Sequence, residues 1–529
     1  MIIAFLQTAT IPTVRQPVII GVGIGYFVAC AAIGLWAARR TKTADDFFVA
    51  GRSIGLVPFA LAAMAATLSG FAFIGGPGLV YAIGMTAVFI ILPASITNTA
   101  GAWVLGKRMR LLGQVRNLLT VPDAIGARYR SPAAQGLSAL AILVGVVGYI
   151  ATNVLALGLV VDALFGVGLV TGIWIGTAVT LVYSASGGIL AGIYTDVFQG
   201  LLMAVASTVV FVFALDSGGG LAAISRTLQA VDPAFLGPWG TSGAMVALSF
   251  FFVFAVGSLG QPHIAHKYYM LKDPRRLKWH PVLMTVSMLL AQLLFVGVGI
   301  AVKSLVVRGD MAPLARPDDA TPLFLLQHVP VFVAALVFAG VAAAIMSTVN
   351  SFLSIGAAAI THDLPKAFRG ARGGGVRPAK ETGAASAASG SGATGASGAS
   401  RALTAGRLWT VVLSLLAAVL AQQSGTLVAF LGIFGYGLFA CTLVPALAIG
   451  LNWEGATREG AIASISLGLV LTLVLETGAW LDWFSLPTGV TITGLTLVLS
   501  MLTFLAVSAM TGGRAANQLD GDVRAVMQM

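Results

Sequence analysis

The chain has 529 residues, of which 58% are hydrophobic and only 9% are charged. Ordinary soluble domains carry roughly 25% charged residues, so this composition excludes a water-soluble fold. The formal net charge of +11 would suit a nucleic-acid-binding protein, but such binding needs a basic face joined to aromatic stacking positions, and the basic residues form none. We therefore expect no nucleic-acid partner, and we expect the lipid bilayer to be the main solvent.

Apolar runs long enough to cross a membrane recur along the chain. About 20 apolar residues cross a hydrocarbon core of roughly 30 Å as a helix. The runs predict an all-α polytopic membrane protein with about thirteen transmembrane helices. In chain order the predicted spans are 18–38, 55–82, 84–105, 134–163, 167–186, 194–215, 241–262, 282–306, 331–362, 406–424, 426–451, 459–478 and 488–510.

The placement of basic residues predicts the orientation of these spans, because Lys and Arg accumulate in cytoplasmic loops. With the N-terminus outside, 25 of the 30 Lys and Arg residues fall in predicted inside loops or in the C-terminal tail. We therefore expect a multi-pass protein of a bacterial inner (plasma) membrane, with its N-terminus outside and its C-terminus cytoplasmic.

Two predicted spans are interrupted by glycine and proline. The span 55–82 carries Ser69-Gly70 and then Gly75-Gly76-Pro77-Gly78, and the span 241–262 ends in Gly257-Ser258-Leu259-Gly260-Gln261-Pro262. Irregular backbone inside a membrane is tolerated where it is buried or lines a cavity. The two spans are five apart, which is the separation of the first helices of two inverted five-helix repeats in a transporter. The alternative is that these glycines only permit close helix packing.

Several motifs resemble the sodium/solute symporter family, which includes the bacterial proline permease and sodium–sugar cotransporters. The resemblance covers roughly residues 40–480, and its most specific part is Ala344-Ile345-Met346-Ser347-Thr348 with the stretch 359–368 that follows. The other matching segments are 43–52, 66–70, 187–188 with 194–199, and 260–264.

Membership of this family implies a LeuT-type core of two inverted five-helix repeats, with one extra helix before it and two after it. The implied organisation is an external N-terminus (1–17), an extra helix and signature loop (18–54), a first repeat (55–215), an external loop (216–240), a second repeat (241–451) that includes a Gly/Ser-rich cytoplasmic linker (370–405), two C-terminal helices (452–510) and a cytoplasmic tail (511–529).

Side-chain hydroxyls and freed carbonyls predict a sodium site, because Na⁺ is a hard cation that prefers oxygen ligands. Ser347 and Thr348 are adjacent, and Ala344 lies one turn earlier. The resemblance implies that these residues meet the carbonyls of Ala65 and Leu68, and that Asp196 lies on the sodium release path. The alternative for the hydroxyls is a hydrogen bond to their own helix, and for Asp196 a helix cap.

The solute is expected beside the two breaks, where half-helix ends can face a carboxylate or a polar group. The candidate substrate-binding residues are Ser69, Phe71, Phe254, Ser258, Gln261 and Pro262. In the proline permease a Trp and a Tyr correspond to Phe254 and Ser258, so the pocket differs here. Amino acid, carboxylate, vitamin and sugar solutes all stay open.

The leading prediction is a sodium-coupled symporter that imports a small organic solute by alternating access. Proton coupling on the same fold and a transporter-like sensor are the alternatives. Na⁺ is the expected coupling ion, with no organic cofactor, and a monomer suffices for this function although a homo-oligomer stays open. We expect no enzyme, because no nucleophile elbow, paired carboxylates or phosphate loop occurs, and His263 and His266 lack further metal ligands.

Overall fold

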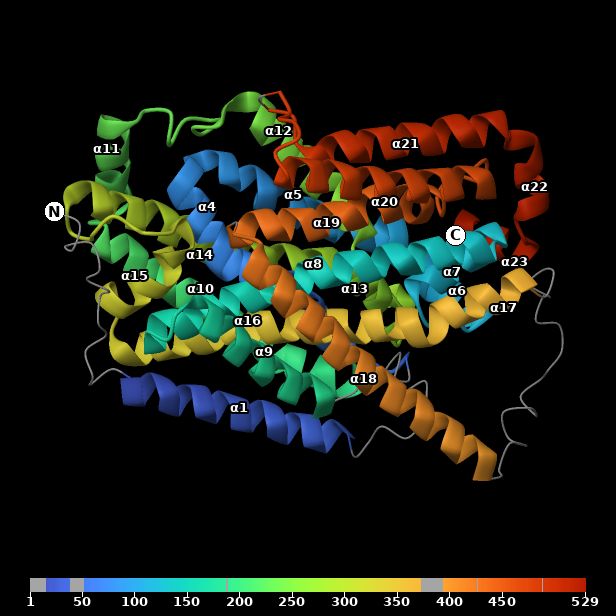
Figure 1. The fold of residues 1–529 in the computed structure, drawn as a ribbon, viewed down its shortest axis with the longest axis horizontal. Coiled ribbons are helices and arrows are strands. Elements are labelled where there is room, and N and C mark those ends of the chain that lie inside the picture. The colour runs from blue at the N-terminus through green and yellow to red at the C-terminus, as the bar shows by residue number, and fades with distance from the viewer. Residues whose placement is uncertain (1–15, 39–51, 187–188, 373–392, 426, 488) are drawn as a thin grey trace.

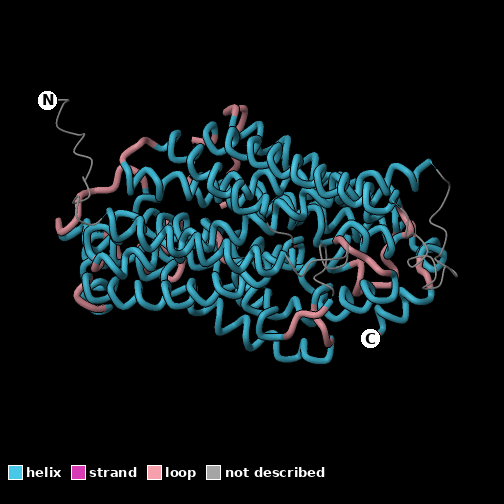
Figure 2. The backbone as a smooth tube through the Cα atoms, turned by 90° about the horizontal axis from the view of Figure 1, so that it is seen from below, coloured by secondary structure: helices cyan, strands magenta, loops and turns pink. Residues whose placement is uncertain are grey.

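The computed structural model describes residues 16–38, 52–186, 189–372, 393–425, 427–487 and 489–529. These residues form helices and loops, with a single isolated bridge between Ile54 and Leu271 as their one β-type pairing; Figure 2 shows helix and loop throughout. Ten of the described helices are long and apolar enough to cross a membrane, and three shorter apolar helices accompany them. The predicted all-α membrane class is confirmed, whereas the count of thirteen spans stays a prediction.

The N-terminal part of the chain contributes twelve named α-helices and four short π or 3-10 segments among the described residues. In chain order they are α1 (Gln16–Ala38), α3 (Leu56–Thr67), η2 (Phe71–Gly75), α4 (Gly76–Ile83), η3 (Gly84–Ala87), α5 (Val88–Gly101), η4 (Ala102–Gly106), α6 (Lys107–Arg116), α7 (Val121–Tyr129), α8 (Pro132–Phe165), α9 (Leu169–Ser186), α10 (Ile189–Ser217), α11 (Leu221–Val231), α12 (Gly243–Gly257), η5 (Ser258–Gly260) and α13 (Pro262–Lys267).

The described C-terminal part continues in the same way. Its elements are η6 (Tyr268–Met270), η7 (Pro274–Trp279), α14 (His280–Arg308), η8 (Pro317–Asp319), α15 (Ala320–His328), α16 (Val331–Ala358), η9 (Ala359–Asp363), α17 (Leu364–Arg372), α18 (Ala393–Gln423), α19 (Val428–Val444), η10 (Pro445–Ile449), α20 (Arg458–Trp480), α21 (Ile492–Met510), η11 (Gly512–Arg514), α22 (Ala515–Gln518) and α23 (Gly521–Gln528).

Local sequence explains where the long central helix α8 begins and ends. The Ser131 hydroxyl accepts a hydrogen bond from the backbone N–H of Ala134, and Pro132 takes the first helical position, where its missing N–H costs nothing. Gly166 closes the helix with a φ of 62°, a left-handed conformation that glycine adopts without strain. The residues between these caps are mostly apolar and buried, so α8 can run through the centre of the bundle.

Most of the long helices run along one long axis of the molecule, and α18 crosses them obliquely (Figure 1). Helix α8 packs against α9, α16 and α19, while α10 packs against α3, α14 and α16. Helix α1 lies along one edge against α10 and α16, and the pair α20 and α21 lies along the opposite edge beside α19. Interior helices therefore surround the two broken spans, and the extra helices lie outside them.

The two ends of the bundle carry different short elements. Helices α11 and α15 lie at one end, and α6, α7, α17 and α23 lie at the other (Figure 1). We call these the α11 end and the α7 end. Helix α1 starts at the α11 end, and α23 closes the chain at the α7 end (Figure 1). A chain with an odd number of crossings begins and ends on opposite sides of the membrane, which agrees with these positions of α1 and α23. We expect the α7 end to be cytoplasmic.

Both predicted interruptions are breaks in the helical backbone. Helix α3 stops at Thr67, and Leu68 is extended with φ −81° and ψ 117°. Helix α12 with η5 stops at Gly260, and Gln261 is extended with φ −72° and ψ 110°. Each break frees backbone groups from intrahelical hydrogen bonds.

The glycines after the first break have a different role, which is close packing. A Cβ on Gly76 would lie 2.1 Å from the Phe295 ring, and a Cβ on Gly78 would lie 2.7 Å from Oδ1 of Asp318. The packing alternative therefore describes Gly75 to Gly78, and the break itself lies at Leu68 to Gly70.

Four predicted segments lie wholly or partly outside the described residues. They are the N-terminus before Gln16, the signature loop over residues 39–51, the motif residues 187–188, and most of the linker 370–405. Helix α18 begins at Ala393, inside the predicted linker, since several alanines there favour a helix. The tail contains α23, which packs on α6 through a contact of Arg116 with Asp520 and Asp522.

Candidate functional site

The first break meets helix α16 at Thr348. The Thr348 hydroxyl lies 3.2 Å from the carbonyl oxygen of Leu68 and 3.4 Å from that of Ala66. Because α3 stops at Thr67, these carbonyls lack the partners that a continuing helix would supply. Of the predicted sodium ligands, the structure brings Leu68 and Thr348 together. Ala65 lies buried in the same turn, and the Ala66 carbonyl, which the sequence did not predict, takes the second contact.

Ser347 faces a different helix from its neighbour. Its hydroxyl donates to Oδ1 of Asp196 on α10 at 2.6 Å, because successive residues of a helix point about 100° apart. Ala344 is fully buried one turn earlier. The predicted ligand set therefore divides into an α3 side at Thr348 and an α10 side at Ser347.

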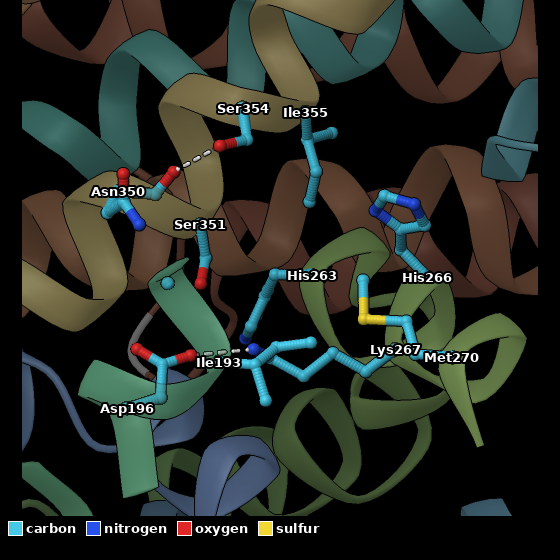
Figure 3. Close-up of a pocket in the computed structure, with 11 residues that line it drawn as sticks. Ile193, Asp196, His263, His266, Lys267, Met270, Asn350, Ser351, Ser354 and Ile355 are labelled. Carbon is cyan, nitrogen blue, oxygen red and sulfur yellow. Dashed lines mark hydrogen bonds and ion pairs between the residues drawn. The ribbon is translucent and has the colours of Figure 1, made fainter. Parts of the chain in front are cut away.

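Asp196 also contacts Lys267, which follows the predicted span 241–262 and was therefore among the basic residues assigned to cytoplasmic loops. The Lys267 ammonium lies 2.9 Å from Oδ2 of Asp196, and the two residues are only 6% and 2% exposed. Figure 3 shows the Lys267 chain reaching across to the carboxylate, with His263 beside it. The signal missed in the sequence is that Pro262 starts a new helical turn, so α13 keeps Lys267 inside the protein.

A small cavity, with room for about one or two water molecules, adjoins this ion pair. Its wall includes Asn350, Ser351 and Ser354, which follow Ser347 along α16 toward α17. The cavity therefore lies between Asp196 and the α7 end. His263 also lines it, and Nδ1 of that buried ring has no hydrogen-bond partner in the described part of the chain.

The predicted solute residues near the first break belong to an aromatic stack. The Phe71 ring lies 6.0 Å from the Phe254 ring, and Phe254 lies 4.4 Å from Tyr436 on α19, in both cases centroid to centroid and nearly parallel. The Tyr436 hydroxyl donates to the carbonyl of Phe254 at 3.2 Å. The structure thus joins Phe71 and Phe254 across the two broken spans and adds Tyr436, which the sequence reading missed.

The residues of the second break form hydrogen bonds within their own span and to α19 and α5. The Gln261 amide donates to the carbonyls of Gly257 at 3.0 Å and Tyr436 at 3.2 Å. The Ser258 hydroxyl donates to that of Thr97 on α5 at 2.7 Å. Ser258 and Gln261 line a second, smaller cavity. Pro262 is buried beside it as the first residue of α13.

An asparagine on α8 covers the start of the helix after the first break. The backbone N–H of Gly70 donates to Oδ1 of Asn153 at 2.9 Å, and that of Phe71 donates to the Ser69 hydroxyl at 3.2 Å. Asn153 is fully buried, and its amide also donates to the carbonyl of Tyr149 at 2.8 Å. Asn153 was not predicted, because nothing in its local sequence marks it.

The motif 359–368 ties η9 and α17 to α7. Asp123 accepts from Lys366 at 2.7 Å and from Gln135 at 2.9 Å, and it contacts Nε2 of His362 at 3.0 Å. Burial would raise the pKa of Asp123, but the His362 hydrogen bond and the Lys366 charge hold it well below its ordinary value. Asp123, His362 and Asp363 have metal-like spacing, yet the Asp123 oxygens already have donors. The motif therefore acts as an anchor between the repeats.

Comparison with known proteins agrees with this architecture. The family model described as "Sodium:solute symporter family" matches residues 47–374. The sodium/pantothenate symporter of Escherichia coli (strain K12) is 27% identical over 460 residues, which cover 86% of this chain and 89% of that protein. The sodium/proline symporter of the same organism is 28% identical over 483 residues, with coverages of 88% and 89%.

A solved structure of a Na⁺-coupled sialic acid symporter, in a substrate-bound outward-open state, has a TM-score of 0.71 and 18% sequence identity. The match covers 94% of this chain and 98% of that one. The predicted LeuT-type fold with its two inverted repeats is thereby confirmed. Since the family model spans more than half of the chain, the protein belongs to the sodium:solute symporter family and is a multi-pass membrane transporter that couples a small solute to sodium.

Proposed function

We propose that this symporter imports a small organic solute bearing a carboxylate, such as an amino acid, with Na⁺ bound between Thr348 and the end of α3. The observation that carries the proposal is the contact of the Thr348 hydroxyl with the freed carbonyls of Leu68 and Ala66. Three oxygens from two helices converge there, and Na⁺ takes ligands of this kind. An ion bound at this point would link α3 to α16 and so favour one arrangement of the two repeats.

Release of the ion would follow the cavity that lies beside Asp196 toward the α7 end. Polar side chains of α16 line this route, and they can replace water around a leaving cation. With the α7 end cytoplasmic, the sodium gradient drives the solute inward.

The features around the breaks favour a solute with one apolar side and one carboxylate. Phe71, Phe254 and Tyr436 provide an apolar wall, and none of the six predicted solute residues is charged. A buried carboxylate then needs backbone N–H groups or the bound Na⁺ as its partners. The N–H of Gly70 is such a donor, and the Asn153 oxygen that occupies it can be replaced by a solute oxygen. Proline, pantothenate and sialic acid, the solutes of the similar proteins, all carry a carboxylate.

A screen of purified protein for thermal stabilisation by solutes, run in Na⁺ and repeated in K⁺, would identify the solute. We expect carboxylate-bearing compounds to stabilise the protein in Na⁺ and to do so much less in K⁺. Stabilisation by uncharged sugars alone would contradict the proposed class.

Uptake into proteoliposomes would then test the ion. Thr348→Ala removes one oxygen ligand, and we expect it to raise the half-saturating Na⁺ concentration by about tenfold, since a ligand of this kind contributes roughly 1.5 kcal/mol. Thr361→Ala is the matched control, because the Thr361 hydroxyl bonds the carbonyl of Ala357 in its own helix. Uptake that ignores Na⁺ and follows a pH gradient would show proton coupling, and binding without uptake would show a sensor.

A further inference from the structure

The buried pair of Asp196 and Lys267 has the composition of a cation site. Oδ2 of the carboxylate contacts the Lys267 ammonium at 2.9 Å, and Oδ1 accepts from the Ser347 hydroxyl at 2.6 Å. Asp196 lies on α10, Lys267 on α13 and Ser347 on α16, and each residue is at most 6% exposed. A carboxylate and a hydroxyl on neighbouring helices are oxygen ligands that a sodium ion would take. Here the cation beside them is a side chain of the protein itself.

The negative charge of the Asp196 carboxylate is balanced by the positive charge of Lys267. A carboxylate at this depth needs one positive partner, because an unpaired buried charge is strongly unfavourable. Lys267 supplies that charge from within the protein, since its side chain is covalently attached and cannot leave with the solute. A Na⁺ at Asp196 would have to displace Lys267 and leave the ammonium buried without a counter-ion.

The neighbouring sodium position stays separate from this pair. Thr348 turns its hydroxyl toward the carbonyls of α3, whereas Ser347 turns toward Asp196. The two consecutive residues therefore serve two different cation positions, of which one is filled by Lys267. The cavity beside Lys267, lined also by His263 and Asn350, gives Na⁺ from the α7 end a route to the Asp196 carboxylate once the ammonium is removed.

We propose that Lys267 is a tethered cation that fills a second cation site formed by Asp196 and Ser347, and thereby limits the transporter to one Na⁺. This inference rests on the proposed function only in placing the first Na⁺ at Thr348. Removing the ammonium opens the second site, so the variant binds one more Na⁺ than the wild type.

The test counts ²²Na⁺ bound to the full chain, purified in detergent, by equilibrium dialysis without any solute. We expect one Na⁺ per wild-type chain and two per Lys267→Met chain. Lys267→Arg keeps the charge and should bind one. The double variant Lys267→Met with Asp196→Asn removes both charges and should return to one. If Lys267→Met does not fold, Lys267→Gln takes its place in the same measurement. A variant counts as folded when it is monodisperse and has a helical circular dichroism spectrum.

Different results distinguish the two proposals. A Lys267→Met or Lys267→Gln chain that folds and binds no more Na⁺ than the wild type overturns the role of Lys267, as does a wild type that binds two. Thr348→Ala should bind its one Na⁺ about tenfold more weakly than the wild type, and combined with Lys267→Met it should keep one Na⁺ bound at unchanged affinity. If Thr348→Ala leaves the affinity for the first Na⁺ unchanged while Lys267→Met still adds one, the Thr348 site is wrong and the tethered cation stands.

Discussion

Both broken spans interrupt their helices, but their freed backbone groups are satisfied in different ways. At the first break, side chains of other helices provide the partners, namely Asn153 of α8 and Thr348 of α16. At the second break, the Gln261 side chain bonds the carbonyl of Gly257 within the same span. Hydrogen bonds to side chains of other helices can be replaced by contacts with an ion or a solute. A break whose freed carbonyl is bonded within its own span keeps its conformation. The first break is therefore suited to binding an ion, and the second to holding a fixed side of the proposed solute site.

The largest expected effect comes from adding a side chain at the closely packed first break. A Cβ on Gly70 would lie 2.6 Å from Cβ of Ala156 and 3.1 Å from a side-chain carbon of Ile345. Gly70→Ala should cost about 1–3 kcal/mol of stability through overpacking and should abolish stabilisation by Na⁺. Thermal unfolding in Na⁺ and in K⁺ measures both effects. Gly25→Ala on α1 is the control, since nothing would lie within 4 Å of an added Cβ there. If both variants lose the same stability and the same stabilisation by Na⁺, the first break has no special role in binding the ion.

The second break should respond with a change in solute affinity alone. Gln261→Ala removes two hydrogen bonds that close this break, each worth about 1 kcal/mol. We expect the half-saturating solute concentration to rise about tenfold while the number of bound Na⁺ ions stays the same. Gln422→Ala, whose side chain contacts Trp174 at an exposed position, should change neither. A fall in Na⁺ binding equal to the loss of solute affinity would show that the two breaks are not distinct.

A pH dependence should arise near the α11 end, where Asp318 bonds the first residue of α19. Burial raises the pKa of Asp318 from 3.8 to about 7, and the backbone N–H of Val428 opposes this rise. The folded chain thus keeps a proton that the unfolded chain loses between these two pH values. Stability from this group is complete below about pH 4 and is lost as the pH rises through about 7.

Asp318→Asn should therefore flatten the decline in melting temperature between about pH 5 and pH 7, the upper part of this window. Asp232→Asn, at an exposed position where the side chain caps a turn, should leave the decline in place. A decline of the same slope in the Asp318→Asn protein would show that another group causes it.

The smallest effect is expected far from both breaks, at the contact of the tail with α6. Arg116 bonds Asp520 and Asp522, and the three side chains are 17%, 26% and 38% exposed. Partly exposed ion pairs contribute about 1 kcal/mol or less and are screened by salt. Arg116→Gln should lower the melting temperature slightly at low salt and not at all at 1 M NaCl. A large, salt-independent loss would mean that α23 is a structural part of the core.

The sequence was sufficient for the membrane class, for the two breaks and for the family. Breaks are visible in a sequence because glycine and proline act on the local backbone, and spans are visible because bilayer thickness sets the length of an apolar run. The assignment of Lys267 to a loop was wrong because basic residues near a predicted span end are normally in water. Only the return of the chain into α13 shows that this one is buried.

Composition, charge placement and local motifs thus determined what kind of protein this is and where its helices break. The tertiary structure alone decided which groups meet at the breaks. Asp196 is 71 residues from Lys267 and 151 from Ser347, and Gly70 is 83 residues from Asn153. No local pattern encodes such pairs, because they depend on how α8, α10, α13 and α16 pack around the first break. That packing separates the hydroxyl expected to bind sodium from the carboxylate that Lys267 already neutralises.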